Sequence, residues 1–266
     1  MKIGIMQGRL SDTPNNEDLD WFPIDSWENE FLIAKNLSFN SIELVIDRKM
    51  RNDNPIWHQT GRARIGEMYN RNNLSPFTCC VNFIIDYALS SEFIIGKVKE
   101  LIGHLSELNF SQIIMPLFEA SDPELNNSRS VGKSVNEIAD YAQKKNIKLL
   151  IETNLSGMAT VKFLSEVGND DVGIVYDIGN ATHCEQDIAL DLDILTENIA
   201  HIHLKDKCEL GKNVLLGSGK VNFDQFFNIL KKNNYKGAFT LETSRGKSAV
   251  TTARKNIKFI REYYGS

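Results

Sequence analysis

Four short segments in the second half of the chain decide the expected fold, because each is an apolar run that ends in charged or polar residues. They read KLLIETN at 148–154, VGIVYDIGN at 172–180, IAHIHLKD at 199–206 and GAFTLET at 237–243. A short, almost continuously apolar run is typical of a strand that is covered on both faces, as in a parallel sheet. We therefore expect four parallel strands here, each followed directly by polar side chains.

The same pattern continues through the first half of the chain, so that eight apolar segments alternate with longer amphipathic stretches. Such alternation predicts a parallel sheet with right-handed crossovers, either open and doubly wound or closed into a barrel. Eight units of about 33 residues each, with no linker rich in proline or serine between them, favour closure. We predict one α/β domain over residues 1–266, a (β/α)8 TIM barrel. Its expected strands are 2–6, 41–46, 77–83, 112–117, 148–151, 172–176, 199–204 and 237–241.

Between these strands, apolar residues recur about every 3.6 positions, which is typical of one face of a helix. Asp25 is expected to cap the first helix, with Glu28 three positions later. The polar stretches 11–23 and 48–60 are expected to form loops over one mouth of the barrel. The expected helices are 25–36, 92–108, 130–145, 161–167, 223–232 and 249–264.

Composition excludes several classes of protein. The formal net charge is −5 and the isoelectric point is near 5.6, which disfavours DNA or RNA as a partner. The amino terminus turns polar too early for a secretory signal, and no run of about 18 apolar residues indicates a membrane span. The four cysteines form no CxxC pair, and the adjacent Cys79 and Cys80 would point to opposite sides of a strand. We expect a soluble, cytoplasmic protein with reduced thiols.

The carboxyl ends of the last four strands carry the residues that indicate chemistry, because functional side chains of a parallel barrel lie at that mouth. Glu152, Asp177, His203 and Glu242 end four consecutive strands. Neighbouring strands lie about 4.8 Å apart, so these four side chains can converge. Each residue alone would more often be a solvated loop carboxylate or a core histidine. Three carboxylates buried together need a cation, so we predict one divalent metal ion, with Mn²⁺, Mg²⁺ or Co²⁺ favoured and Zn²⁺ possible.

The segments IETN, YDIGN, HIHLKD and LET, in this order after MKIGIMQGRLS, resemble the xylose-isomerase-like TIM-barrel superfamily of sugar and sugar-phosphate isomerases and epimerases. The resemblance spans essentially the whole chain. It implies that Glu152, Asp177, His203 and Glu242 bind the metal ion. It also implies that Glu152 and Glu242 act as an acid/base pair on opposite faces of an enediolate. The implied partner is a small sugar substrate, and the superfamily commonly forms homo-oligomers.

Two positions depart from the family pattern. Many of its epimerases have a histidine where this chain has Asn180, and some have an arginine where it has Glu209. His183 is a possible substitute from the same loop. These departures weaken the specific assignment as a ketose 3-epimerase, but they leave the four expected metal ligands untouched.

Further polar residues near the strand ends are candidates for holding the substrate. Lys205 should share the inward face of His203, and Arg9 and Arg245 could bind a carboxylate or phosphate bidentately. Glu43, Asn82 and Glu119 are expected to line the pocket as well, whereas His201 fits a structural role deeper in the barrel. The candidate substrate-binding residues are Gln7, Arg9, Asn180, Lys205 and Arg245.

Three other functions remain open. An inosose-type dehydratase would use the same metal ion and enolate, and would then expel a β-hydroxyl group. A non-catalytic sugar-binding barrel is also compatible with the pattern. A nuclease similar to AP endonuclease IV would need three zinc ions and additional histidines, and is disfavoured by the histidines that the chain contains, which are His58, His104, His183, His201 and His203.

Overall fold

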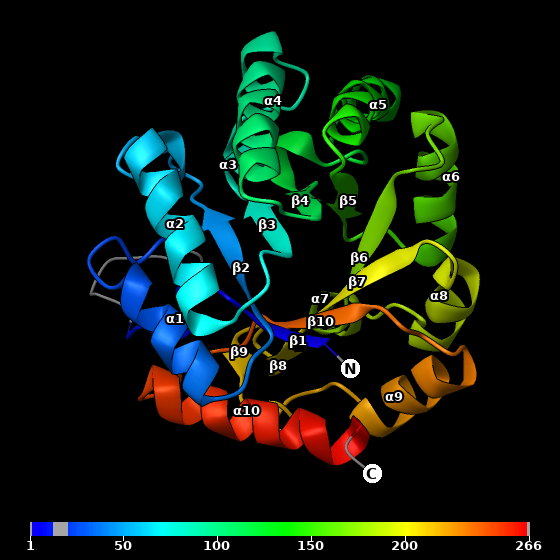
Figure 1. The fold of residues 1–266 in the computed structure, drawn as a ribbon. Helices are drawn as coiled ribbons and strands as arrows, with labels where there is room; N and C mark the ends of the chain where they lie inside the picture. The colour runs from blue at the N-terminus through cyan, green and yellow to red at the C-terminus, as the bar shows by residue number, and fades with distance from the viewer. Residues whose placement is uncertain (1, 13–20, 265–266) are drawn as a thin grey trace.

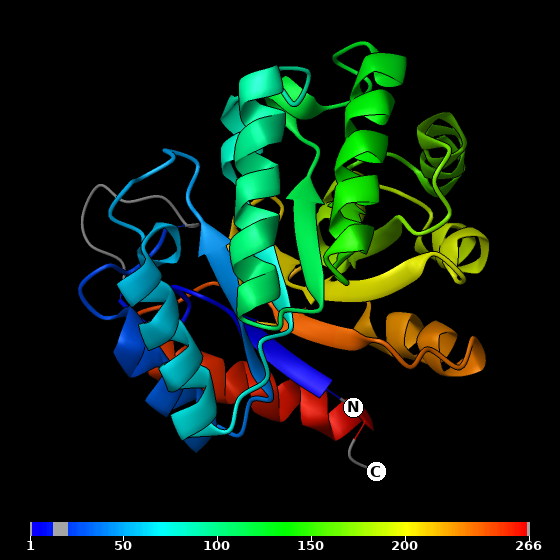
Figure 2. The same cartoon turned by 45° about the horizontal axis from the view of Figure 1, so that its top comes forward.

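A computed structural model describes residues 2–12 and 21–264 of the chain. Eight parallel strands form a closed barrel in the order β1-β10-β7-β6-β5-β4-β3-β2, with helices around its outside (Figures 1 and 2). The α/β fold is therefore a (β/α)8 TIM barrel, as predicted. The barrel strands are β1 (Lys2–Met6), β2 (Ser41–Ile46), β3 (Thr78–Val81), β4 (Gln112–Pro116), β5 (Lys148–Glu152), β6 (Gly173–Asp177), β7 (Ile199–Leu204) and β10 (Ala238–Leu241).

The register of the strands places the four candidate ligands at one mouth. Asp177, the last residue of β6, is opposite His203 of β7, and His203 is opposite Thr240 of β10. Glu152 is the last residue of β5, and Glu242 directly follows β10. Because all eight strands are parallel, their carboxyl ends share one edge of the barrel, where functional groups gather in this fold.

The six expected helices all form, with some boundaries shifted, and four further helices are present among the described residues. Helix α1 begins at Trp27, because residues 24–26 form a turn, and its N-cap residue Ser26 makes no side-chain capping bond; the expected cap at Asp25 was wrong. Helices α2, α3, α7 and α8 were not predicted. None of the described helices is long and apolar enough to cross a membrane. The helices are α1 (Trp27–Asn36), α2 (Gln59–Asn72), α3 (Phe83–Asp86), α4 (Glu92–Glu107), α5 (Ser128–Lys144), α6 (Gly157–Val167), α7 (Ile178–His183), α8 (Ile188–Leu195), α9 (Phe223–Lys232) and α10 (Ala249–Tyr264), with short 3₁₀ turns η1 (Pro55–Trp57) and η2 (Glu119–Ser121).

Two stretches, 11–23 and 48–60, were expected to form loops over the mouth, and the structure describes only the second in full. Residues 13–20 lie outside the described part of the chain, so the expectation for 11–23 is described only at its ends. Within 48–60, the chain forms η1 and then enters α2, which makes this stretch partly helical. Arg48, at its start, lines the pocket described below.

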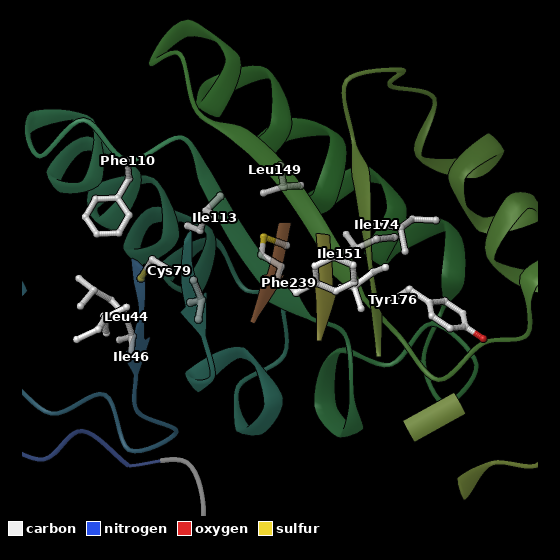
Figure 3. Packing of buried hydrophobic residues seen from close by; sticks show 14 of the residues in the cluster. Leu44, Ile46, Cys79, Phe110, Ile113, Leu149, Ile151, Ile174, Tyr176 and Phe239 are labelled. Atoms are coloured by element: carbon white, nitrogen blue, oxygen red, sulfur yellow. The ribbon is translucent and has the colours of Figure 1, made fainter. Parts of the chain in front are cut away.

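Apolar packing divides into a large outer core and a small inner one. The outer core lies between strands and helices and includes Leu44, Cys79 and Ile113 (Figure 3). The inner cluster, inside the barrel, consists of Cys80, Ile114, Leu150 and Val175. Cys79 and Cys80 therefore face opposite sides of β3, as predicted. All four cysteines of the chain are unpaired.

A single carboxylate organises the long connection between β7 and α9. Asp206 begins a small antiparallel pair, β8 (Asp206–Lys207) with β9 (Asn213–Val214), and its side chain is fully buried. It accepts backbone N–H bonds from Gly217 at 3.0 Å, Gly219 at 2.7 Å and Val221 at 3.1 Å. Bonds to a charged acceptor are stronger than neutral ones, so this carboxylate fixes the loop beside the mouth.

Candidate metal and active site

The four predicted ligands come together at the carboxyl mouth. Glu152, Asp177, His203 and Glu242 are all buried, and one ligand atom from each lies within 4.8 Å of the others. Nδ1 of His203 lies 3.0 Å from Oε2 of Glu242 and 3.4 Å from Oε2 of Glu152. Oδ1 of Asp177 accepts the N–H of Asn180 at 2.9 Å and so caps α7, while Oδ2 stays directed to the cluster.

The donor set fits a divalent cation. Nδ1 of His203 is buried and makes no well-aligned hydrogen bond, although it faces two carboxylates. A buried nitrogen of this kind normally has a partner, and a metal ion would supply one. Carboxylate oxygens with one imidazole nitrogen suit Mg²⁺, Mn²⁺, Co²⁺ or Zn²⁺.

Lys205 supplies positive charge inside the cluster. Its Nζ lies 2.7 Å from Oδ2 of Asp177 and 2.7 Å from Oε1 of Glu242. Burial alone would lower the pKa of Lys205, but the two carboxylates outweigh it, so the pKa lies well above its ordinary value. The Lys205 ammonium and the guanidinium of Arg9, which lies 3.6 Å from Glu242, offset two of the three carboxylates of Glu152, Asp177 and Glu242. The remaining negative charge is left for a cation to offset.

The two glutamates have different environments. Burial raises the pKa of Glu152 to about 7. Burial also acts to raise the pKa of Glu242, but the Lys205 ammonium and the His203 ring outweigh it, so this pKa lies below its ordinary value. The carboxyl groups are thus chemically distinct, although both face His203.

Behind His203, a second carboxylate holds the ring from the other side. Glu43 is fully buried, and its Oε1 lies 3.0 Å from Nε2 of His203. Its Oε2 accepts hydrogen bonds from Thr78 at 2.7 Å and Thr240 at 3.0 Å. Glu43 was expected to line the pocket; instead it lies beneath His203, because the side chain belongs to the interior-facing row of β2. A carboxylate at this place orients a metal-binding imidazole and selects its tautomer.

His201 has the structural role that was expected for it. It is buried, and its Nε2 lies 2.8 Å from Oγ1 of Thr240. Burial lowers the pKa of His201 to about 3, which keeps the ring neutral. It therefore extends the polar network of Glu43 and Thr240 beneath the four ligands.

A model of the xylose isomerase-like TIM barrel family matches residues 31–263. The chain belongs to the xylose isomerase-like TIM barrel family.

Proteins similar to this chain have names that describe different reactions. An L-ribulose-5-phosphate 3-epimerase of Escherichia coli is 23% identical over 236 residues, which cover 82% of this chain and 82% of the relative. An inosose dehydratase of Histophilus somni is 26% identical over 163 residues, about half of each protein (51% and 55%). The crystal structure of a D-psicose 3-epimerase with D-tagatose, from Clostridium cellulolyticum H10, has a TM-score of 0.77 at 15% identity and covers 99% of both chains.

The xylose isomerase-like barrel has a pocket of about 430 Å³ directly above the four ligands. A volume of this size suits a small molecule. A wider hollow of about 810 Å³ lies at the opposite end of the barrel, beside Leu37 and Arg261, away from the ligand cluster. The smaller pocket is lined by Glu152, Asn154, Asn180, Lys205 and Glu242 on one side and by Arg48, Asn82, Glu119 and Asp122 on the other.

Of the expected substrate-binding residues, the structure brings Asn180 and Lys205 to this pocket but not the other three. Gln7 is buried, and its Oε1 accepts the N–H of Val45 at 3.4 Å. Arg9 is buried behind Glu242, 3.6 Å from Oε1. Arg245 donates from Nε to the carbonyl oxygen of Gly8 at 2.5 Å. Gln7 therefore contacts β2, Arg9 lies against Glu242, and Arg245 holds the loop after β1.

Proposed function

We propose that this chain is a metal-dependent isomerase or epimerase of a small sugar or sugar phosphate, with Glu152 and Glu242 as its acid/base pair. The observation that carries the proposal is the placement of these two carboxylates. Both are buried, both face His203, and both line the same pocket. The Escherichia coli relative named L-ribulose-5-phosphate 3-epimerase supports the same class of reaction.

Glu152, Asp177, His203 and Glu242 would hold one divalent ion, Mn²⁺, Mg²⁺, Co²⁺ or Zn²⁺. When bound, such an ion supplies Lewis-acid stabilisation of the negative charge that develops on the carbonyl and neighbouring hydroxyl oxygens of a sugar. Glu43 would keep the His203 ring in the orientation that directs Nδ1 to this place, because its carboxylate lies 3.0 Å from Nε2.

The chain's own groups then move one proton. A carboxylate of the pair removes the proton from the carbon next to the carbonyl group, and a carboxyl group returns it. Return to the opposite face of the same carbon by the second glutamate gives an epimer. Return to the neighbouring carbon on the same face, together with transfer of the hydroxyl proton to the former carbonyl oxygen, gives an isomer. Lys205 and Asn180 line the pocket beside the pair and would donate hydrogen bonds to substrate oxygens.

The second candidate function is a dehydratase of the inosose type. The alignment of half the chain with an inosose dehydratase favours it. Such an enzyme would remove the same kind of proton with the same carboxylates, but would expel a β-hydroxyl group as water instead of returning the proton.

Product analysis in heavy water tests the proposal. The protein, loaded in turn with Mn²⁺, Mg²⁺, Co²⁺ or Zn²⁺, is incubated in D₂O with a panel of ketoses and their phosphates. We expect a product that is an isomer of the substrate and carries one solvent deuteron on a carbon, because the proton is returned from solvent-exchanged carboxyl groups. A product that has lost water would replace the proposal by the dehydratase. Failure of every substrate to take up deuterium on carbon would contradict the isomerase or epimerase.

A further inference from the structure

We propose that the substrate of this pocket carries no phosphate group, and that the half of the pocket away from the metal ligands receives an uncharged polyhydroxy group. This inference rests on the proposed function, and it chooses between the free sugar and the sugar phosphate. Three features carry it: an arginine held between two carboxylates, the balance of charge in the pocket, and the backbone N–H groups of two loops.

The pocket has two distinct halves. The four ligands lie at the carboxyl ends of β5, β6, β7 and β10, whereas Arg48, Asn82 and Glu119 follow β2, β3 and β4. In the closed strand order, β3 lies across the barrel from β7 (Figure 1). Because the reacting carbons must lie at the ligands, the remainder of a sugar chain extends towards the ends of β2, β3 and β4.

An ion cluster that we name the Arg48 clamp occupies this distal half. Nε and Nη2 of Arg48 donate to Asp86 at 2.9 and 2.5 Å. Nη1 and Nη2 donate to Glu119 at 3.1 and 2.8 Å. Paired, bidentate contacts of this kind use the same guanidinium edges that recognise a phosphate. With two carboxylates on one guanidinium, the clamp carries a net charge of −1 and would repel a phosphate dianion.

Among the residues described, the lining of the distal half has no cationic side chain besides Arg48. This one cation stands there against the carboxylates of Glu119 and Asp122. In the other half, a bound divalent ion, Lys205 and Arg9 would offset the charge of the ligand carboxylates. Lys205 is held at 2.7 Å by both Asp177 and Glu242. Residues 13–20, which the structure does not describe, contain no lysine or arginine.

Backbone N–H groups that bind phosphate in many barrels are already engaged. Phosphate sites of this fold often use the loops after the seventh and eighth strands and a helix N-terminus. After β7, the N–H groups of Gly217 and Gly219 donate to Asp206. After β10, the N–H of Ala249, the first residue of α10, donates to Asp12 at 3.0 Å. In each loop, a carboxylate of the chain thus already accepts these backbone N–H groups.

The test compares a ketose with its terminal phosphate on the metal-loaded protein. We expect kcat/KM for the free sugar to exceed that for the phosphate by about 100-fold, because like charges placed together disfavour the phosphate. The double variant Asp86→Asn/Glu119→Gln removes the carboxylate charges and leaves Arg48 to accept a phosphate. We expect it to move the preference towards the phosphate by at least about 10-fold. Glu119→Gln alone is the milder variant, with a smaller shift in the same direction.

Asp53→Asn is the matched control, since Asp53 pairs with Arg51 at 2.9 Å outside the pocket lining. It should leave the preference unchanged. A wild-type protein that converts or binds the phosphate better than the free sugar would overturn the inference and leave the proposed enzyme class intact. If neither compound is converted, the proposed function fails separately. Calorimetric titration with the two compounds then still decides the inference, because tighter binding of the phosphate contradicts it.

Discussion

Glu152→Gln and Glu242→Gln are each expected to abolish exchange of the substrate's C–H proton with solvent, while the protein stays folded. An amide of the same shape cannot accept the proton, and loss of a general base costs about 100- to 10,000-fold in rate. Both carboxylates also face His203, at 3.4 and 3.0 Å, so metal content is measured on each variant by elemental analysis. Exchange is followed by NMR in D₂O, and folding by circular dichroism.

Glu209→Gln is the matched control, because Glu209 is an exposed glutamate on the loop after β7 and pairs with Lys220 at 3.2 Å. It should retain the exchange rate of the unchanged protein. Retained exchange in both Glu152→Gln and Glu242→Gln would remove the acid/base roles. Lost exchange together with lost metal in only one of them would assign that residue to metal binding alone.

His203→Ala is expected to lose the metal ion, because the substitution removes the imidazole, which is the only nitrogen ligand beside the three carboxylates.

Glu43→Gln should weaken metal binding by about 10- to 100-fold without abolishing it, since Glu43 orients the His203 ring and does not belong to the four ligands. Titration calorimetry gives the affinity, and elemental analysis after gel filtration gives the stoichiometry.

His183→Ala provides the histidine control, since His183 is an exposed residue at the end of α7. It should bind metal as the unchanged protein does. Metal content that is the same in His203→Ala as in the unchanged protein would refute the ligand assignment. Metal loss in His183→Ala would instead place a ligand on the loop after β6.

The barrel and the four-residue cluster could be predicted because parallel strands impose their own geometry. Once 148–151, 172–176, 199–204 and 237–241 are read as parallel neighbours, the residues at their carboxyl ends must share a mouth. The carboxyl ends of these strands are also clear in the sequence, because the apolar runs are followed there by Glu152, Asp177 and Glu242. No knowledge of the loops was needed for this step.

Helix α2 escaped prediction because its sequence gives a weak apolar period. Its buried residues are Ile65, Met68, Tyr69 and Asn72. Only the first three of these are apolar, in a helix of 14 residues. The helix is stabilised by tertiary packing and not by a regular apolar face. The ring of Tyr69, for example, packs edge-on against Phe31, and its hydroxyl group donates a hydrogen bond to the carbonyl oxygen of Ile42.

The buried role of Glu43 could have been predicted from the sequence, which indicated it only as a pocket-lining residue, whereas the Arg48 clamp could not. Glu43 stands alone as an ionisable residue inside the apolar run SIELVI, which indicates a buried partner. The clamp joins Arg48, Asp86 and Glu119 over sequence separations of 38 and 71 residues. Its geometry depends on the paths of three loops, for which the sequence carries no periodic signal.

The most direct test of this account is the position of a metal ion in crystals of the protein soaked with Mn²⁺. Anomalous scattering locates the ion without reference to any assigned role. We expect one strong peak bounded by Glu152, Asp177, His203 and Glu242. A strong peak at another place, with no density among these four side chains at saturating Mn²⁺, would contradict it.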